Sequence, residues 1–245
     1  DRMDCGEGDC EVSLEIQDLN SCSRGRFGVR SRDLDAVTWG YRSLIVSGSN
    51  VVWSELQENG CGRIAGLDLL TGRSEFLTEL DGACHAGPGL SGDWLTWEKN
   101  AERKIVMLRN LETGEERELT PEGEFYLYPE TDGRYVVYSR EDGERADLFA
   151  YEISTGEVTP VVEQPNVQTA AYLFDGKLSW TDLRDSSREH YGYTAAYYEK
   201  ELPDGEERLL RPALTPIIYG RRVGEGLVWI DARTQRPTLW GKPKL

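Results

Sequence analysis

The chain has 245 residues, a formal net charge of −16 and only two histidines. Binding of duplex nucleic acid or of an anionic membrane surface needs clustered Lys and Arg, so this composition argues against both as the main partner. No apolar run approaches the ~20 residues of a membrane-spanning helix, and a content of 10% aromatic residues argues against disorder.

The first 41 residues precede the repetitive part of the chain and hold three of its five cysteines. Within them, residues 11–18 alternate apolar and polar side chains, which predicts a β-strand. Residues 26–30 are a second candidate strand. We expect one domain overall, in which the Cys-containing segment 1–41 supplies a strand to the repeats of residues 42–245.

The rest of the chain repeats. A short apolar run ends in an aromatic residue five times, and a Gly-bearing turn precedes each run. These aromatic residues are Trp53, Trp97, Tyr138, Trp180 and Trp229, at steps of 44, 41, 42 and 49 residues. A second turn recurs in phase with the first, with its glycine at Gly72, Gly114, Gly156 and Gly205. Thr-Gly or Asp-Gly between two alternating segments predicts a tight hairpin.

Each repeat therefore reads as four short strands, which in the second repeat are residues 89–91, 94–98, 104–109 and 116–120. Four antiparallel strands in ~40–45 residues are typical of a β-propeller blade. We predict an all-β fold, a β-propeller of five four-stranded blades.

The fifth repeat is incomplete, because after Trp229 it has only one further strand, at residues 237–240. Residues 208–245 carry eight basic and two acidic side chains, whereas the preceding part of the chain is strongly acidic. We expect the acidic strand 11–18 to complete this basic blade and close the ring, with residues 26–30 as the second candidate. An open solenoid is the alternative, but closure would remove exposed strand edges.

The cysteines predict disulfides and an oxidising compartment. Cys61 and Cys84 each lie beside a glycine turn, so we expect a bridge between them. A second bridge is expected within the N-terminal segment, as Cys10–Cys22 or else Cys5–Cys22, which leaves one cysteine over. Free cytosolic thiols are the alternative. The spacing fits no zinc site, and His85 is expected in a loop.

The repeats resemble those of TolB-like propellers in the order of glycine turn, aromatic-ended strand, loop with acid or Arg, second strand and Thr-Gly turn. The segments that carry this resemblance are residues 90–97, 146–156, 180–184 and 229–233. The resemblance covers residues 42–245 and implies a propeller fold, but hardly any function. TolB itself has another domain ahead of its propeller, so we do not transfer its partners to this chain.

Two acid–arginine pairs follow strands that end near a tryptophan: Asp182 with Arg184, and Asp231 with Arg233. Residues two apart on an extended strand face the same side, so each pair can form an ion pair. One interpretation is a polar binding site on a face of the propeller. The other, which we favour, is a brace between blades that recurs because the blade recurs.

The longest insert of the repeats contains His190 and Tyr191 and accounts for the 49-residue step. Extra loop length with aromatic residues often builds a binding surface, so we take this insert as the first candidate contact region. Alternatively, Tyr191, Tyr193 and Tyr197 alternate along the core side of one strand.

Catalytic motifs are scarce. The chain has no G-x-S-x-G elbow, no triad pattern and no phosphate-binding glycine loop. Glycoside cleavage needs only two carboxylates, so it stays open in a chain with 44 acids. The spaced oxygen ligands of a calcium loop are missing, and we expect neither a metal nor a cofactor.

We therefore predict a monomeric, non-catalytic propeller that binds a protein or a cell-envelope component, in the periplasm or outside the cell, with any lipid anchor lying before Asp1. The alternative is a carbohydrate-active propeller, either a lectin or a glycoside hydrolase or lyase.

Overall fold

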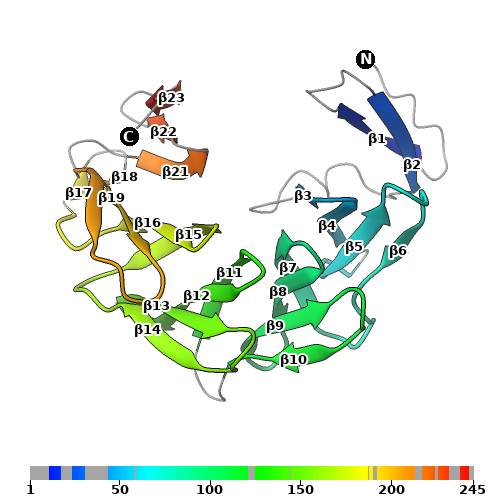
Figure 1. Ribbon diagram of the computed structural model, residues 1–245, viewed down its shortest axis with the longest axis horizontal. Helices are drawn as coiled ribbons and strands as arrows, with labels where there is room; N and C mark the ends of the chain where they lie inside the picture. Colours follow the sequence, from blue (N-terminus) through cyan, green and yellow to red (C-terminus); the bar gives the residue numbers. More distant parts are fainter. Residues whose placement is uncertain are drawn as a thin grey trace. The chain divides into compact units, whose positions relative to one another are not determined.

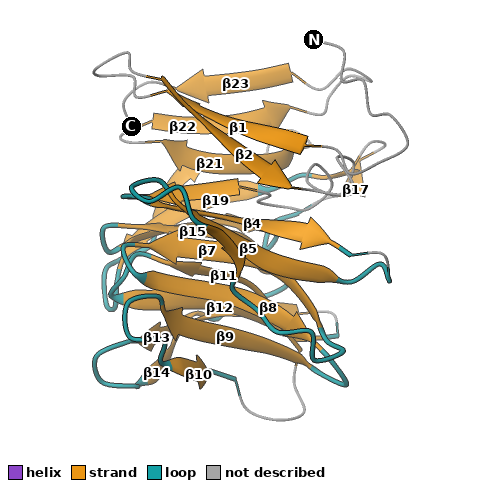
Figure 2. Cartoon of the chain, turned by 90° about the vertical axis from the view of Figure 1, so that its right-hand side faces the viewer, coloured by secondary structure: helices purple, strands orange, loops and turns teal. Residues whose placement is uncertain are grey.

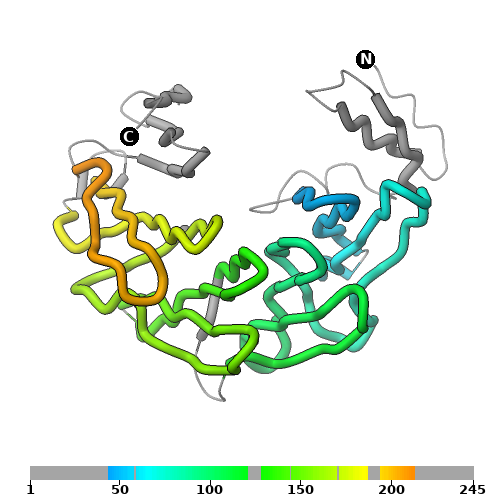
Figure 3. The backbone as a smooth tube through the Cα atoms, in the orientation of Figure 1, coloured from blue at the N-terminus to red at the C-terminus, as the bar shows by residue number. Residues whose placement is uncertain are grey.

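The chain forms two compact units, residues Asp1–Pro88 and Gly89–Leu245. A computed structural model describes residues 11–17, 24–30, 44–57, 59–120, 125–143, 145–186, 188–189, 192–212, 217–223, 226–231 and 238–242 (Figure 3). These residues form β-strands and turns and contain no helix (Figure 2). The prediction of an all-β fold is confirmed for this part of the chain.

The first unit begins with a hairpin. β1 (Glu11–Gln17) pairs antiparallel with β2 (Arg24–Arg30), with Leu14 opposite Phe27 at its centre. The two segments that we predicted as alternative closing strands are thus partners of each other. Closure of the ring by an N-terminal strand stays a prediction.

A four-stranded antiparallel sheet follows in the same unit. Its strands lie in chain order: β3 (Leu44–Ser47), β4 (Asn50–Leu56), β5 (Gly62–Asp68) and β6 (Ser74–Phe76). Alternation along β4 and β5 puts Val51, Trp53, Ala65 and Leu67 on one face, where they form a buried cluster at 0–3% exposure. Burial of this apolar face fixes the register, since a slip by one residue would turn these side chains to the other face.

Three more four-stranded antiparallel sheets follow, each with its strands in sequence order except for one insert (Figure 1). The first contains β7 (Cys84–Ser91), β8 (Trp94–Asn100), β9 (Lys104–Asn110) and β10 (Glu116–Glu118). The second contains β11 (Phe125–Thr131), β12 (Tyr135–Asp142), β13 (Arg145–Glu152) and β14 (Val158–Val162).

The third of these sheets contains β15 (Gln168–Phe174), β16 (Lys177–Asp182), β19 (Ala196–Glu201) and β20 (Arg208–Arg211). The predicted insert after β16 is a short hairpin of β17 (Arg188–Glu189) and β18 (Gly192–Tyr193). A last sheet has three described strands, β21 (Ile217–Val223), β22 (Gly226–Asp231) and β23 (Thr238–Lys242).

The predicted turns are present where the structure describes their residues, and the turn before the fifth run, at residues 224–225, lies outside them. Gly114 and Gly156 follow Thr at the hairpins after β9 and β13, with φ of 74° and 75°. A side chain is strained in this left-handed region, which is why glycine marks the turn in the sequence. The strand limits in the second repeat match our prediction closely, except that β7 begins at Cys84, five residues earlier than expected.

Successive sheets of the second unit pack face to face through apolar side chains. Val106 and Leu108 of β9 pack with Val136 and Tyr138 of β12. On the other side of the same sheet, Val137 of β12 belongs to a second buried cluster with residues of β15 and β16, including Trp180. The alternation along β12 therefore serves two interfaces at once, as expected for a blade between two neighbours.

Candidate functional site

The predicted pair Asp182 and Arg184 forms an ion pair at the end of β16. Arg184 Nη2 donates to Asp182 Oδ2 at 2.6 Å, and the Arg184 backbone N–H donates to Asp182 Oδ1 at 2.8 Å. The indole Nε1 of Trp180 donates to the same Oδ2 at 2.9 Å. Asp182 is fully buried, and both oxygens of its carboxylate accept hydrogen bonds from within the protein.

Arg184 extends this network to the other strands of the sheet. Its Nη2 lies 2.9 Å from Glu207 Oε2, in the turn before β20. Its guanidinium stacks over the ring of Tyr198 in β19, with Cζ 4.3 Å from the ring centroid. Burial opposes the charge of Arg184, but hydrogen bonds to Asp182 and Glu207 outweigh it and raise the pKa of the guanidinium above its ordinary value. Arg184 therefore joins β16, β19 and β20 as a permanent cation.

The ion pair thus lies within one blade rather than between two. The connection to the preceding sheet is carried instead by the side chain and the main chain of Asn166. Asn166 Nδ2 donates to the carbonyls of Leu183 and Arg184 at 3.2 and 3.3 Å. The backbone carbonyl of Asn166 accepts a hydrogen bond from the backbone N–H of Ala146 in β13 at 3.3 Å. This connector ties the turn after β16 to the previous blade.

The remaining predicted site residues are not brought together with this network. Asp231 ends β22, a strand described only by its backbone. His190, Tyr191, Arg233, Cys10 and Cys22 lie outside the described residues. The roles of all these residues stay predictions.

Tyr193 and Tyr197, predicted to alternate along one strand with Tyr191, lie on two different strands, and Tyr191 is outside the described residues. β18 ends at Tyr193, and β19 begins at Ala196. Tyr197, in β19, is 2% exposed, and this burial raises the pKa of its hydroxyl to about 12. Its phenol therefore stays protonated at neutral pH, as a core residue rather than as an acid–base group.

The predicted bridge between Cys61 and Cys84 is present in the first unit. It joins the hairpin turn between β4 and β5 to the first residue of β7. His85, which we expected in a loop, lies in β7 and is 3% exposed, with its Nε2 3.2 Å from Asp81 Oδ1. Gly62 follows Cys61, and a Cβ there would lie 2.5 Å from the His85 carbonyl oxygen. The disulfide therefore holds two backbones in close approach.

Sequence reasoning missed a tryptophan–acid motif. In β4, as in β16, an indole N–H donates to the carboxylate two residues further on, from Trp53 to Glu55 at 3.4 Å. It also missed Arg117 of β10, which reaches the Tyr151 hydroxyl and the Ile153 carbonyl at 3.2 Å each. The spacing of the aromatic and the acid was a usable signal for the first. Nothing local indicates the second, whose partners lie more than 30 residues away.

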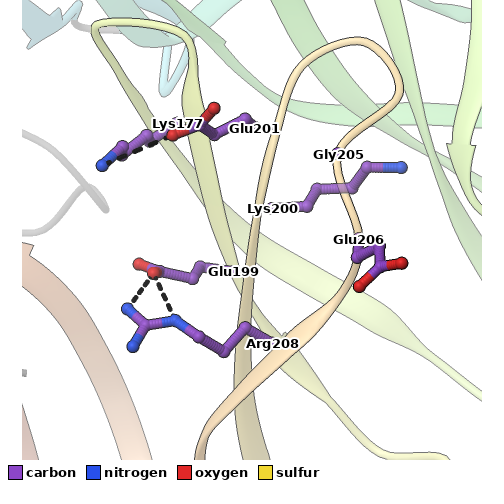
Figure 4. A pocket seen from close by; sticks show the side chains of 7 residues that line it. All are labelled: Lys177, Glu199, Lys200, Glu201, Gly205, Glu206 and Arg208. Atoms are coloured by element: carbon purple, nitrogen blue, oxygen red, sulfur yellow. Dashed lines mark hydrogen bonds and ion pairs between the residues drawn. The ribbon is translucent and has the colours of Figure 1, made fainter.

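A polar hollow of about 230 Å³ opens on the sheet of β15, β16, β19 and β20 (Figure 4). Two ion pairs cross it: Lys177 Nζ lies 3.6 Å from Glu201 Oε1, and Arg208 binds Glu199, with its Nε 2.9 Å from Glu199 Oε1. The lining residues are Lys177, Glu199, Lys200, Glu201, Gly205, Glu206 and Arg208. Equal numbers of acids and cations make the hollow suited to a polar side chain.

Within the described ranges, no group of three or more His, Cys, Asp or Glu side chains is placed to hold a metal ion. No helix long and apolar enough to cross a membrane occurs in the same part of the chain.

No protein-family model matches the sequence, and no curated protein matches it. Solved structures do match. TolB from Acinetobacter baumannii is 15% identical with a TM-score of 0.59, over 93% of this chain and 61% of that one. An oligogalacturonate lyase from Vibrio parahaemolyticus is 15% identical with a TM-score of 0.65, over 94% of this chain and 71% of that one. A prolyl endopeptidase is 11% identical with a TM-score of 0.65, over 90% of this chain and 36% of that one.

The chain thus spans less than two thirds of the length of the TolB structure. The matched proteins carry names of different activities at identities of 11–15%, so the likeness concerns the fold and no particular function. The repeated four-stranded antiparallel sheets of this chain agree with this likeness in fold. At the level of fold, the chain is similar to TolB and to other β-propeller proteins.

Proposed function

We propose that this chain is a non-catalytic binding scaffold that presents the surface of a propeller to a protein or cell-envelope partner. The proposal rests on the buried acids, whose carboxylates are engaged in hydrogen bonds and ion pairs within the protein. Asp182 is bonded by Trp180 and Arg184, Glu55 by Trp53, and Asp147 by Arg145 at 2.8 Å. Carboxylates that are bonded in this way to near neighbours in the chain are poorly placed to transfer protons to a substrate.

The disulfide supports a location outside the cytoplasm. Cytosolic thiols are kept reduced, whereas bridges such as Cys61–Cys84 form and persist in the periplasm or outside the cell.

A carbohydrate-active propeller is the second candidate. The likeness in fold to an oligogalacturonate lyase, which extends over 71% of that chain, favours it over other enzymatic functions. Acid-rich surfaces and exposed polar hollows are compatible with a sugar ligand.

Two measurements on the purified full chain separate these functions. In the first, the protein is cross-linked in an envelope fraction, and each captured partner is identified, purified and titrated against the chain. We expect each partner to bind the disulfide-bonded chain saturably. The exposed substitution Asp185→Asn should not change this affinity.

In the second measurement, the chain is incubated with oligogalacturonate and other polysaccharides, and the release of reducing or unsaturated ends is followed. We expect no turnover. Turnover that disappears when one carboxylate is replaced by its amide would overturn the scaffold in favour of the carbohydrate-active protein.

A further inference from the structure

The four-stranded sheets differ in how their outer strands are protected against pairing with another chain. β6 and β10 are only three residues long, and β10 reads Glu-Arg-Glu. β14 is interrupted by Pro160, which lacks a backbone donor. Short, charged and proline-containing strands are the usual protection of a sheet edge. β20 has four residues, Arg-Leu-Leu-Arg, so it is charged at its ends, but it has two leucines at its centre and no proline.

β20 also offers contact surface for a side chain on each face. Its register places Arg208 opposite Glu199, and Leu209 opposite Tyr198, so neighbouring positions point to opposite faces. Leu209 is 49% exposed. Arg208 borders the hollow of about 230 Å³ that opens beside the strand (Figure 4). Leu209 and Arg208 thus offer one apolar and one polar contact on opposite faces of the edge.

The charges that line the hollow are balanced, but the exposed acids before β20 and the net charge of the chain favour a basic guest. In the hollow, Glu199 and Glu201 are neutralised by Arg208 and Lys177. Lys200 Nζ donates to the Val161 carbonyl at 3.1 Å. Glu206 is, like Glu201, an exposed acid of the lining, and it lies in the connection between β19 and β20, which also contains the exposed Asp204. A chain with a net charge of −16 adds a long-range attraction for cations.

We propose that β20 binds an extended, basic peptide segment of a protein partner by strand addition. The main chain of the segment pairs with the edge, one lysine or arginine enters the hollow beside Glu206, and an apolar side chain lies against Leu209. Main-chain pairing of this kind supplies affinity, and pockets for alternate side chains supply specificity. The inference rests on the proposed scaffold function and names the surface and the type of segment that it recognises.

Synthetic peptides test the strand addition on the full chain. The probe is a labelled peptide of about seven residues that alternates valine and lysine, the length of an ordinary strand. A peptide of the same composition, with its lysines in one block, is the control. We expect saturable binding of the alternating peptide, measured by fluorescence anisotropy, and binding at least about fivefold weaker for the control.

Backbone methylation gives a sharper test. Alternate backbone nitrogens of an added strand point to the edge or to solvent. Two probes, methylated on one or the other set of nitrogens, should therefore differ, with binding lost for one and kept for the other. Equal binding of the two methylated probes, or no binding of the unmodified probe, overturns the proposal.

Protein variants locate the site. Glu206→Gln is expected to lower the affinity for the alternating peptide by up to about fivefold at low salt, the effect of losing an exposed ion pair. The same substitution should not change the affinity for a probe whose lysines are replaced by threonine. The matched control is Glu116→Gln on β10. Leu209→Ser should weaken binding about fivefold, and Val158→Ser on β14 should not. Equal effects of a variant and its control mean non-specific attraction and contradict the site.

Failure of this proposal is distinguishable from failure of the scaffold function. If an identified partner binds Leu209→Ser and Glu206→Gln as tightly as the native chain, the partner uses another surface, and the scaffold function stands. Turnover of a polysaccharide would instead remove the scaffold function, whatever the peptides do.

Discussion

The tryptophan–acid clamp explains why buried carboxylates are tolerated in this fold. Trp180 and Asp182 lie on the same face of β16, two residues apart, and the indole N–H needs an acceptor once the ring is buried. The carboxylate in turn needs donors, and Arg184 supplies a second one. Trp53 and Glu55 repeat the arrangement in β4. Trp229 and Asp231 in β22 have the same spacing, which predicts a third clamp.

The change Asp182→Asn tests the energetic importance of the clamp. It removes a fully buried charge and leaves Arg184 with Glu207 as its remaining acid. We expect the free energy of unfolding to fall by about 3 kcal/mol, the low end for breaking a buried ion pair, because Glu207 still compensates part of the Arg184 charge. Urea denaturation measures the loss.

The control for this variant is Asp185→Asn in the same turn, where the side chain is exposed. It should change the free energy of unfolding by less than about 0.5 kcal/mol. Equal stability losses in the two variants would show that Asp182 contributes through general charge and not through its bonds.

Glu55 predicts a pH dependence. Burial raises its pKa above the ordinary value of 4.5, against the opposing effects of the Trp53 bond and the Arg63 charge. The folded state then keeps the proton to higher pH than the unfolded state, so the contribution of this carboxyl to stability falls as the pH rises from 4.5 through the raised pKa.

Glu55→Gln removes this titration. The difference in free energy of unfolding between the variant and the native chain should therefore move in favour of the variant as the pH rises from 4.5, and level off above the raised pKa. Denaturation curves at several pH values measure the difference. A difference that does not change with pH would contradict the raised pKa.

At the scale of elements, the sequence predicts the strands and hairpins well, because both leave local patterns. A Thr-Gly turn needs a left-handed glycine, and Gly114 and Gly156 therefore mark their hairpins. Successive apolar side chains of β12 point to opposite faces, so the apolar run in its sequence indicates that both faces are buried. The short hairpin β17–β18 left no comparable pattern, and its residues had suggested either a loop or a single strand.

The candidate site was predictable only in part. Asp182 and Arg184 are close in sequence, so their ion pair was predictable, although Arg184 lies in the turn after β16 and not on the extended strand that we expected. Glu207 lies 23 residues beyond Arg184 and reaches it through the pairing of β16, β19 and β20. Asn166 reaches the same turn from the connector between two sheets. Contacts set by strand pairing across a sheet have no signature in local spacing.

The disulfide makes a prediction for the elements that it joins. Cys61 and Cys84 are 23 residues apart, and a loop of that size predicts a stabilisation of about 3 kcal/mol. Replacement of both residues by Ser should lower the free energy of unfolding by that amount. Thermal denaturation of the native chain with and without reductant provides an independent measurement, and an unchanged midpoint in both would show that the bridge contributes no stability.

At the scale of the whole molecule, the excess of acids has a testable consequence. A net charge of −16 repels itself in the compact state. Raising the ionic strength from about 0.01 M to about 0.15 M shortens the screening length from about 30 Å to about 8 Å. The free energy of unfolding should therefore rise. A fall would mean that screening of surface ion pairs, such as Arg73–Glu75, outweighs the relief of repulsion.

The N-terminal segment provides a further whole-molecule prediction. If an N-terminal strand completes the last blade, deletion of residues 1–22 should accelerate hydrogen exchange in β23 (Thr238–Lys242) as well as in β2. Hydrogen exchange read by mass spectrometry separates the two segments. Faster exchange confined to β2 would show that β1 serves only its own hairpin.

The tryptophan clamps also provide built-in spectroscopic probes. An indole proton held by a buried carboxylate, as in Trp180, exchanges slowly with solvent and should give a resolved resonance of its own. Trp53 and Trp180 belong to different sheets, one in each compact unit. Their two indole signals therefore report separately on each unit, and their loss during denaturation would show which blade opens first.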